Sequence, residues 1–443
     1  MQEIKKINLS LEKIKTVTLA DVSINNKGEY GIGASAVDYS DELYTYLRIT
    51  DINDDGTLNK NDLKSVDDVD AKNYLLNEND VVFARTGNST GKAYYYDKMD
   101  GELVYAGFLI KFSLDSSKIN PKFMKYYVLS KDYKGWVNSM CTGSTRPNIN
   151  AKMYGNMELI LPPREQQDFL VNILGEIDNK IEINKRINKN LEKTLITIFN
   201  SWFINFENYD NSKGMKIDES YGEIPVDWSV EMLEDYVDFV TGVEPGSKNY
   251  HEKPEPHDIP FLRVGDLGSR DNGVFIDPSL SKNKILKYDD IVLSLDATIG
   301  IVKMGLEGAY STGMRKLVIK NDNINQPFLY CLVKSNRIQR IIETFATGTT
   351  ILHAGKSIKH MNFVLSDKKT MDDFGKIGNP IISIILTNLK EIEYLTNLRD
   401  TLLPKLMSGE IDVSKINCDL ELKYNYMKYL FNQIHTPMSK SVV

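Results

Sequence analysis

The chain has 443 residues, of which 42% are hydrophobic and 26% charged, and its formal net charge is −7 at pH 7. At about 100–200 residues per domain, this composition is typical of a globular protein of two to four domains and excludes a disordered or fibrous chain. No apolar run approaches the roughly 18–20 residues of a membrane-spanning helix, and residues 1–6 precede no signal-like apolar stretch. We therefore expect a cytoplasmic protein, with any nucleic-acid contacts made by local basic surfaces rather than by net charge.

An internal repeat of roughly 210 residues organises the sequence. Arg48 and Asp51, within YLRITDI, recur 215 positions later as Arg263 and Asp266, within PFLRVGDL. LNENDVVF at 76–83 recurs as LKYDDIVL 210 positions later, and TGST at 142–145 recurs as TGTT 205 positions later. Because the offset falls steadily, the sequence predicts one module present twice, with short loop deletions in the second copy.

The first copy, residues 1–163, is predicted to be rich in strands between 16 and 161. Within it, residues 51–62 match the spacing of a calcium-binding EF-hand loop, with Gly56 at position 6 and Asp62 in place of the final Glu. The preceding residues 44–49 are aromatic and β-branched, as in a strand, and the second copy lacks the ligands. We favour a strand-to-turn connection and keep a calcium-binding scaffold or adhesion module as the alternative.

A Thr/Ser-rich turn with a nearby cation occurs in each copy, at 142–148 and at 347–356, and residues 85–92 form a second such segment in the first copy, opposite the divergent residues 296–300. Hydroxyl and amide side chains beside cations suit contacts to phosphates and base edges. They lie in or near basic stretches: residues 111–152 hold 8 Lys and Arg against 2 acids, and residues 303–369 hold 11 against 4. We expect one basic face per copy. The candidate nucleic-acid-binding residues are Arg85, Asn88, Ser89, Lys92, Thr142, Ser144, Thr145, Arg146, Asn148, Thr298, Thr347, Thr349, Thr350 and Lys356.

A long helix is predicted over residues 164–206, where apolar residues alternate in steps of four and three. This heptad seam spans about 48 Å at ~1.5 Å per residue. Its members are Leu170, Leu174, Ile177, Ile181, Asn184, Asn188, Leu191, Leu195, Ile198 and Trp202. The two Asn residues are expected to fix the register and the partner of the helix, at a cost in stability.

A polar linker is predicted over residues 207–228, followed by the second copy at 229–368, a second long helix at 369–412 and a tail at 413–443. The second seam is weaker and is interrupted by Glu391, and its residues are Ile377, Ile381, Ile384, Asn388, Leu395, Leu398 and Leu402. Two long helices in one chain are expected to pair, with Asn184 and Asn188 meeting polar partners near Asn388. The alternative is that each helix packs only on its own domain.

Signatures of catalysis and of metal binding fail on spacing. The triplet at 355–357 resembles the end of a phosphate-binding loop, but Thr350 stands where the motif requires glycine. The five His and three Cys residues form no HExxH motif and no paired-cysteine knuckle, so no metal site is expected. The sequence therefore favours a binding protein over an enzyme.

The order of these parts resembles the DNA-specificity subunits of Type I restriction-modification enzymes over residues 16–412. The resemblance rests on YLRITDI at 46–52, TGSTRPNI at 142–149, LPPREQQ at 161–167, the heptad helix and GEIPVDW at 222–228. The second copy departs from the pattern, since LSDKK at 365–369 stands where PP and EQ are expected.

The resemblance implies a mixed α/β fold with two pseudo-twofold-related target-recognition domains, joined by two long antiparallel coiled-coil helices. It implies a non-catalytic subunit in which each domain reads one half of a bipartite double-stranded DNA site and the helices set the spacer. Its implied partners are two methyltransferase subunits and restriction/translocase subunits. It also implies no cofactor in this chain, with S-adenosylmethionine, ATP and magnesium in the partners.

Overall fold

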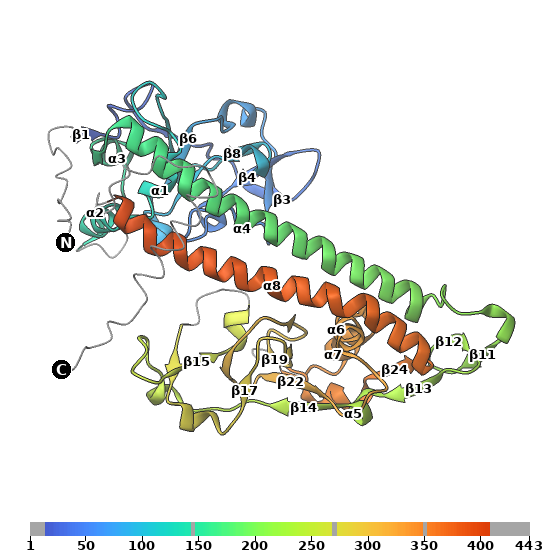
Figure 1. Ribbon diagram of the computed structural model, residues 1–443. Helices are drawn as coiled ribbons and strands as arrows, with labels where there is room; N and C mark the ends of the chain where they lie inside the picture. Colours follow the sequence, from blue (N-terminus) through green and yellow to red (C-terminus); the bar gives the residue numbers. More distant parts are fainter. Residues whose placement is uncertain (1–13, 143–146, 268–272, 349–351, 408–443) are drawn as a thin grey trace, which may run out of the picture. The chain divides into compact units, whose positions relative to one another are not determined.

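The computed structural model describes residues 14–142, 147–267, 273–348 and 352–407. The chain divides into two compact units, one formed by Met1–Asn179 with Leu395–Val443 and the other by Lys180–Tyr394. Each unit contains one copy of the repeat (Figure 1). No helix in the described ranges is long and apolar enough to cross a membrane.

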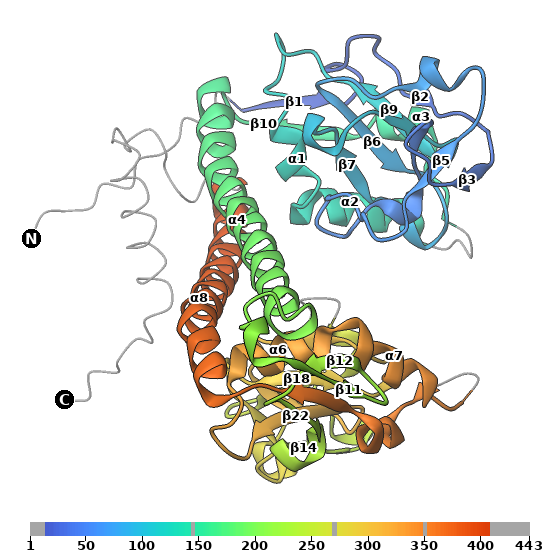
Figure 2. The ribbon, with the colours of Figure 1, turned by 90° about the vertical axis from the view of Figure 1, so that its right-hand side faces the viewer.

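The first unit is built on two four-stranded sheets and one two-stranded sheet (Figure 2). The first sheet has the order β2 (Glu29–Tyr30), β9 (Leu109–Ser113), β6 (Asp80–Ala84) and β7 (Ala93–Tyr95). The second has the order β3 (Ala36–Asp38), β5 (Lys64–Val66), β4 (Tyr44–Leu47) and β8 (Leu103–Tyr105), and β1 (Lys15–Thr18) pairs with β10 (Glu158–Leu161). Three helices accompany them: α1 (Phe123–Tyr127), α2 (Lys131–Cys141) and α3 (Ala151–Gly155).

The second unit repeats this plan. Its first sheet has the order β14 (Val237–Thr241), β22 (Met314–Ile319), β18 (Ile291–Ser294) and β20 (Val302–Lys303). Its second has the order β16 (Phe275–Ile276), β15 (Ile259–Leu262), β21 (Gly308–Tyr310) and β17 (Ile285–Leu286), and β13 (Ser229–Met232) pairs with β24 (Asn362–Leu365). Its short helices are α5 (Leu233–Tyr236), α6 (Gln326–Lys334) and α7 (Asn336–Thr344).

Matching registers confirm the prediction of one α/β module present twice. Strand β6 pairs Ala84 with Leu109, and β18 pairs Ser294 with Met314 in the same position. The parallel pairs β4·β8 and β15·β21 also correspond. Both β6 and β18 are buried along their whole length, which explains their nearly continuous apolar sequences.

Helix α4 (Arg164–Phe199) contributes to both units, and the π-helical turn that follows it (Asn200–Ile204) belongs to the second. In the first unit, the Asp178 carboxylate accepts hydrogen bonds from Lys125 Nζ (2.9 Å), Tyr126 Oη (3.1 Å) and Arg399 Nη1 (3.1 Å). In the second, the Glu192 carboxylate bonds Tyr330 Oη (2.5 Å) and also Lys334 Nζ. A carboxylate on α4 is thus bound by a Tyr and a Lys in each unit.

Helix α8 (Lys368–Met407) begins after Asp367, an N-cap that the sequence pattern did not predict. Asp367 accepts hydrogen bonds from the Thr370 main-chain N–H (3.0 Å), the Thr370 hydroxyl (2.7 Å) and the indole N–H of Trp228 (3.3 Å). Burial disfavours the Asp367 carboxylate, but these hydrogen bonds outweigh it and lower its pKa. The departure from the PP and EQ pattern is therefore compensated by another N-cap, and the buried Trp228 of GEIPVDW anchors it.

Residues 207–228, predicted as a linker, contain an antiparallel hairpin of β11 (Met215–Asp218) and β12 (Gly222–Pro225). Polar composition hid these strands, because Lys216 and Ile217 of β11 and Gly222 and Glu223 of β12 are exposed. The hairpin leads directly into Trp228.

Helices α4 and α8 run antiparallel and side by side within each unit (Figures 1 and 2). In the second unit, Asn184 Nδ2 donates to Glu391 (2.8 Å) and Asn388 Nδ2 donates to Asn188 Oδ1 (2.8 Å). Asn188 Nδ2 also donates to the Ile385 carbonyl (3.1 Å). Glu391 is thus a polar partner within the interface rather than an interruption of it.

The seam predicted for the second helix is wrong in its first half. Ile377 and Ile384 are 38% and 47% exposed, whereas Ile382, Ile385 and Ile392 are buried. The later members Leu395, Leu398 and Leu402 are buried, as is Leu195 of the first seam, while Leu191 is half-buried.

Candidate DNA-recognition surface

In the first unit, the structure brings together two segments that lie far apart in the sequence. The main-chain N–H of Ile149 donates to the Arg85 carbonyl (2.9 Å), and Thr86 forms a bridge with Asn148. Within the first segment, Gly91 N–H donates to the Ala84 carbonyl (3.0 Å). We call residues 85–92 and 147–149 the first loop pair.

The second unit contains the same main-chain arrangement in residues 295–301 and 352–354, the second loop pair. Ala354 N–H donates to the Leu295 carbonyl (2.7 Å), and Asp296 pairs with His353. Gly300 N–H donates to the Ser294 carbonyl (2.9 Å), as Gly91 does in the first unit.

The hydrogen bonds and strand pairings define which residues are equivalent in the two loop pairs and in the strands beside them, and these side chains differ. The equivalent residues, first and second unit in turn, are Tyr30 and Thr241, Arg85 and Leu295, Thr86 and Asp296, Phe108 and Gly313, Ile110 and Arg315, and Asn148 and His353. Main-chain geometry is thus kept while the chemistry changes.

Arg85 and Asn148, both candidates from the sequence, are in contact. Arg85 Nε donates to Asn148 Oδ1 (3.3 Å), and its guanidinium lies over the Tyr30 ring, 5.0 Å from the ring centroid. Asn148 is exposed, and Arg85 is half-buried. A guanidinium and an amide held side by side suit bidentate contacts to guanine and adenine.

The remaining described candidates of the first unit surround this pair less directly. Asn88 and Lys92 line a cleft of about 410 Å³ with Lys134 and Asn138 of α2. Lys92 Nζ is already bonded to Asp54 (2.8 Å), so its charge is partly compensated. Ser89 is half-buried on the turn Gly87–Ser89, and Thr142 is exposed at the end of α2, where its hydroxyl donates to the Asn138 carbonyl (2.8 Å).

In the second unit, His353 Nδ1 hydrogen-bonds Asp296 Oδ1 (2.7 Å) at the exposed end of the loop pair. Arg315 lies nearby, beside Gly355, and burial lowers its pKa while the Asp296 carboxylate opposes that effect. Of the candidates, Thr298 and Lys356 are exposed, and the Thr347 hydroxyl donates to the His353 carbonyl (3.3 Å). Ser144, Thr145, Arg146, Thr349 and Thr350 lie outside the described residues.

The expected basic face on each copy stays a prediction, because the count of charges behind it includes cations that are paired with acids. Many of the counted Lys residues bond to acids: Lys111 to Glu29, Lys118 to Asp115, Lys125 to Asp178, Lys316 to Asp290, Lys320 to Asp238, Lys334 to Glu192 and Lys368 to Asp322. Sequence counting cannot distinguish such internal pairs from free surface cations.

In the EF-hand-like loop, the Asp51 carboxylate is already hydrogen-bonded within the protein. Arg48 Nη2 and Nε donate to Asp51 Oδ1 (2.7 Å) and Oδ2 (2.9 Å), and the second unit repeats this between Arg263 and Asp266. The loop is entered from strand β4, as predicted. No group of three or more His, Cys, Asp or Glu side chains in the described ranges could hold a metal ion. The repeated Arg–Asp pair therefore closes a turn in each unit.

Sequence reasoning missed Tyr30, Phe108, Asp296, His353 and Arg315. Only the position of Tyr30 could have been found from the sequence. A glycine follows Tyr30 in the first copy, and a glycine also follows its equivalent in the second copy. A Cβ on Gly31 would lie 2.2 Å from the Tyr105 carbonyl oxygen, and one on Gly242 would lie 2.1 Å from that of Tyr310. Both glycines permit the same strand crossing.

We expect Gly31→Ala to destabilise the first unit by about 2–3 kcal/mol, because the atoms it would meet belong to the backbone and cannot move aside. Gly33→Ala is the matched control, since a Cβ there meets nothing within 4 Å, and its expected change is within about 0.5 kcal/mol. Urea unfolding of the two variants measures the difference. Equal stabilities would contradict the close approach at Gly31.

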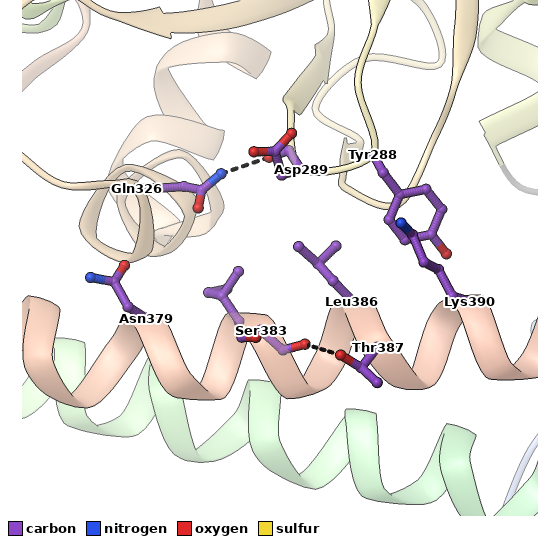
Figure 3. Close-up of a pocket in the computed structure, with 9 residues that line it drawn as sticks. Tyr288, Asp289, Gln326, Asn379, Ser383, Leu386, Thr387 and Lys390 are labelled. Atoms are coloured by element: carbon purple, nitrogen blue, oxygen red, sulfur yellow. Dashed lines mark hydrogen bonds between the residues drawn. The ribbon is translucent and has the colours of Figure 1, made fainter.

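A further cleft of about 410 Å³ lies in the second unit, between α8 and the residues before β18 (Figure 3). Lys390 Nζ lies 4.6 Å from the centroid of the Tyr288 ring, and Gln326 Nε2 donates to the Asp289 carbonyl (2.6 Å). The cleft contains no residue of the second loop pair. It is a feature of helix packing and not of the recognition surface.

The chain therefore contains two copies of one domain, which carry unlike side chains on a common loop scaffold. This is the arrangement of a protein with two recognition domains in tandem. Its sequence matches the model of the Type I restriction modification DNA specificity domain over residues 12–193 and 225–401. The chain belongs to this family of DNA-binding specificity subunits, in which catalysis lies in other subunits of the complex.

Curated relatives and a solved structure agree with this assignment. The specificity subunit of the Type I restriction enzyme MjaIX of Methanocaldococcus jannaschii is 28% identical over 310 residues, which cover 67% of this chain and 70% of that protein. The HindI specificity subunit of Haemophilus influenzae is 21% identical, covering 90% and 99%. The crystal structure of the S subunit from M. genitalium shares the fold, with a TM-score of 0.51, 17% identity and coverage of 92% and 98%.

Proposed function

We propose that each domain reads one half of a bipartite site in double-stranded DNA, and that its loop pair supplies the contacts. The single observation that carries this proposal is the conserved main-chain scaffold with different side chains in the two units. A scaffold that positions Arg85 and Asn148 in one copy, and Asp296 and His353 in the other, presents different donors and acceptors to the base edges.

The proposal extends to the spacer and to the partners. The polar contacts of Asn184 and Asn188 hold α4 and α8 in one register, which suits a fixed spacer between half-sites. Two methyltransferase subunits would then modify adenine, and restriction/translocase subunits would cut. S-adenosylmethionine, ATP and magnesium would belong to those partners.

One experiment uses equivalent substitutions in the two units. The chain is produced with its methyltransferase subunits as wild type, as Asn148→Ala or as His353→Ala, and methylated adenines are mapped by sequencing. We expect each variant to relax a different half-site by about 1–3 kcal/mol of discrimination, and Lys98→Ala, an exposed cation away from the loop pairs, to change neither.

The outcome discriminates sharply. Relaxation of the same half-site by both variants would contradict the assignment of one half-site to each domain. Unchanged site choice in both would remove the loop pairs from the DNA interface.

A further inference from the structure

Two exposed aromatic side chains lie next to the first loop pair, and the second loop pair has no equivalent of them. Phe108 is 58% exposed and Tyr30 is 42% exposed, whereas Gly313 and Thr241 occupy the equivalent positions. A single exposed apolar side chain is common on a protein surface, but here the Tyr30 ring lies against the Arg85 guanidinium and the Phe108 carbonyl accepts the Arg85 main-chain N–H, so two exposed aromatic residues contact one residue of the loop pair.

Hydrogen bonds hold both aromatic residues in place. The Phe108 carbonyl accepts the main-chain N–H of Arg85 (3.0 Å), and the Tyr30 hydroxyl accepts the N–H of Ala151 (3.2 Å). The glycines next to them, Gly31 and Gly107, lie at the same strand crossing, where a Cβ on Gly107 would come within 3.2 Å of the Ile32 carbonyl oxygen. Phe108 is therefore displayed on a fixed turn rather than on a loose loop.

The side chains around Phe108 are of the kinds that contact base-pair edges and phosphates. Arg85 and Asn148 offer hydrogen bonds, and the exposed Lys152, directly after Ala151, offers a positive charge to the phosphate backbone. The apolar group that a base presents in the major groove is the C5-methyl of thymine, which aromatic side chains contact favourably. The exposed phenyl ring of Phe108, whose carbonyl is bonded to the Arg85 main chain, is complementary to that methyl group.

We propose that Phe108 is a specificity-determining residue that contacts a thymine methyl group in the half-site read by the first domain, with Tyr30 positioning Arg85 beside it. This inference rests on the proposed function of the loop pairs. It requires an A·T pair in that half-site and predicts no such aromatic contact in the other.

The test removes the methyl group from the DNA and the phenyl ring from the protein. Oligonucleotides carrying the mapped site are made with deoxyuridine in place of each thymine in turn, and adenine methylation is measured with the complete methyltransferase complex. For wild type we expect one deoxyuridine in the first half-site to slow methylation by roughly 3–10-fold. Phe108→Ala should lose a similar factor on normal DNA and be indifferent to that substitution.

Three controls separate the explanations. Phe108→Leu keeps apolar surface and should retain sensitivity to the methyl group, and Met99→Ala, at an apolar position outside the loop pair that is 79% exposed, should behave as wild type. Thermal unfolding and size-exclusion chromatography verify folding and assembly of each variant.

Equal sensitivity of wild type and Phe108→Ala at every thymine would overturn the inference, as would a first half-site made only of G·C pairs. Failure of Phe108→Ala to assemble with the methyltransferase subunits would also overturn it, by placing Phe108 in a protein interface. In all three cases a bipartite methylation site would persist, so the proposed function would stand. Absence of any bipartite site would instead sink the proposed function itself.

Discussion

Asp178→Ala is expected to lower the free energy of unfolding of the first unit by about 3 kcal/mol, the largest effect of any single substitution considered. The carboxylate bonds Lys125, Tyr126 and Arg399, and its removal leaves the guanidinium of Arg399, 16% exposed, without one of its two acidic partners. Breaking a buried pair typically costs 3–5 kcal/mol. The lower figure applies because Lys125 is 38% exposed and Arg399 keeps Asp400.

The stability of the same variant can also be tested as a function of pH. Burial disfavours the Asp178 carboxylate, but Lys125 and Arg399 outweigh it and hold its pKa below the ordinary value. A carboxyl group with a lowered pKa stabilises the fold fully above about pH 4, the pKa of the unfolded chain, and loses that contribution as pH falls through the folded pKa. The difference between wild type and Asp178→Ala should therefore shrink between pH 5 and pH 3.

Urea unfolding at several pH values measures both effects. The control is Glu182→Ala on the same helix, where the carboxylate is 72% exposed and its contact with Lys185 is long, at 3.9 Å. That change should cost less than about 0.5 kcal/mol. A cost for Asp178→Ala equal to that of Glu182→Ala, or one independent of pH, would contradict the described network.

Arg85→Ala is expected to weaken discrimination at one base pair of the first half-site by about 1–3 kcal/mol, or roughly 5–150-fold. The guanidinium is oriented by Asn148 and by the Tyr30 ring, so its fork is fixed before DNA arrives. Competition binding of the complex to single-base variants of the site, at several salt concentrations, gives both the discrimination and the salt slope.

Arg85→Lys distinguishes two uses of the charge. If Arg85 reads guanine, Lys cannot reproduce the oriented fork and discrimination stays weak. If Arg85 only contacts a phosphate, Lys restores binding, and the alanine variant merely lowers the salt slope by about one for all sequences. The second pattern would contradict a base-reading role.

The repeat was predictable because equivalent strands keep their register. YLRITDI and PFLRVGDL recur because each Arg bonds the Asp three residues on and closes a turn at the end of a strand. The EF-hand spacing arose from the same Asp51, and only the Arg48 contact shows that its carboxylate already has a cationic partner.

The second helix shows where heptad patterns fail. Its first turns bury Met371 and Phe374 and then two glycines: a Cβ on Gly378 would lie 2.4 Å from Pro327, and one on Gly375 would lie 2.9 Å from Asn325. Because glycine carries no hydropathy signal, the apparent seam of Ile377 and Ile384 was one position away from the buried face.

The recognition surface was only partly visible in the sequence. Arg85 and Asn148 were predicted as candidates because each lies in a polar segment. Their contact could not be predicted, because the two residues are 63 positions apart and meet only through the strand register. Phe108 lies in the turn before the largely buried β9, where apolar patterning conceals an exposed side chain, and Arg315 is half-buried within β22.

Mapping of methylated adenines across a genome that is modified by this chain and its partner subunits tests the central claim most directly. Two copies of one recognition domain predict a single motif of two short specified segments, different from each other and separated by an unspecified spacer of constant length. A continuous motif, or a spacer that varies from site to site, would contradict the account.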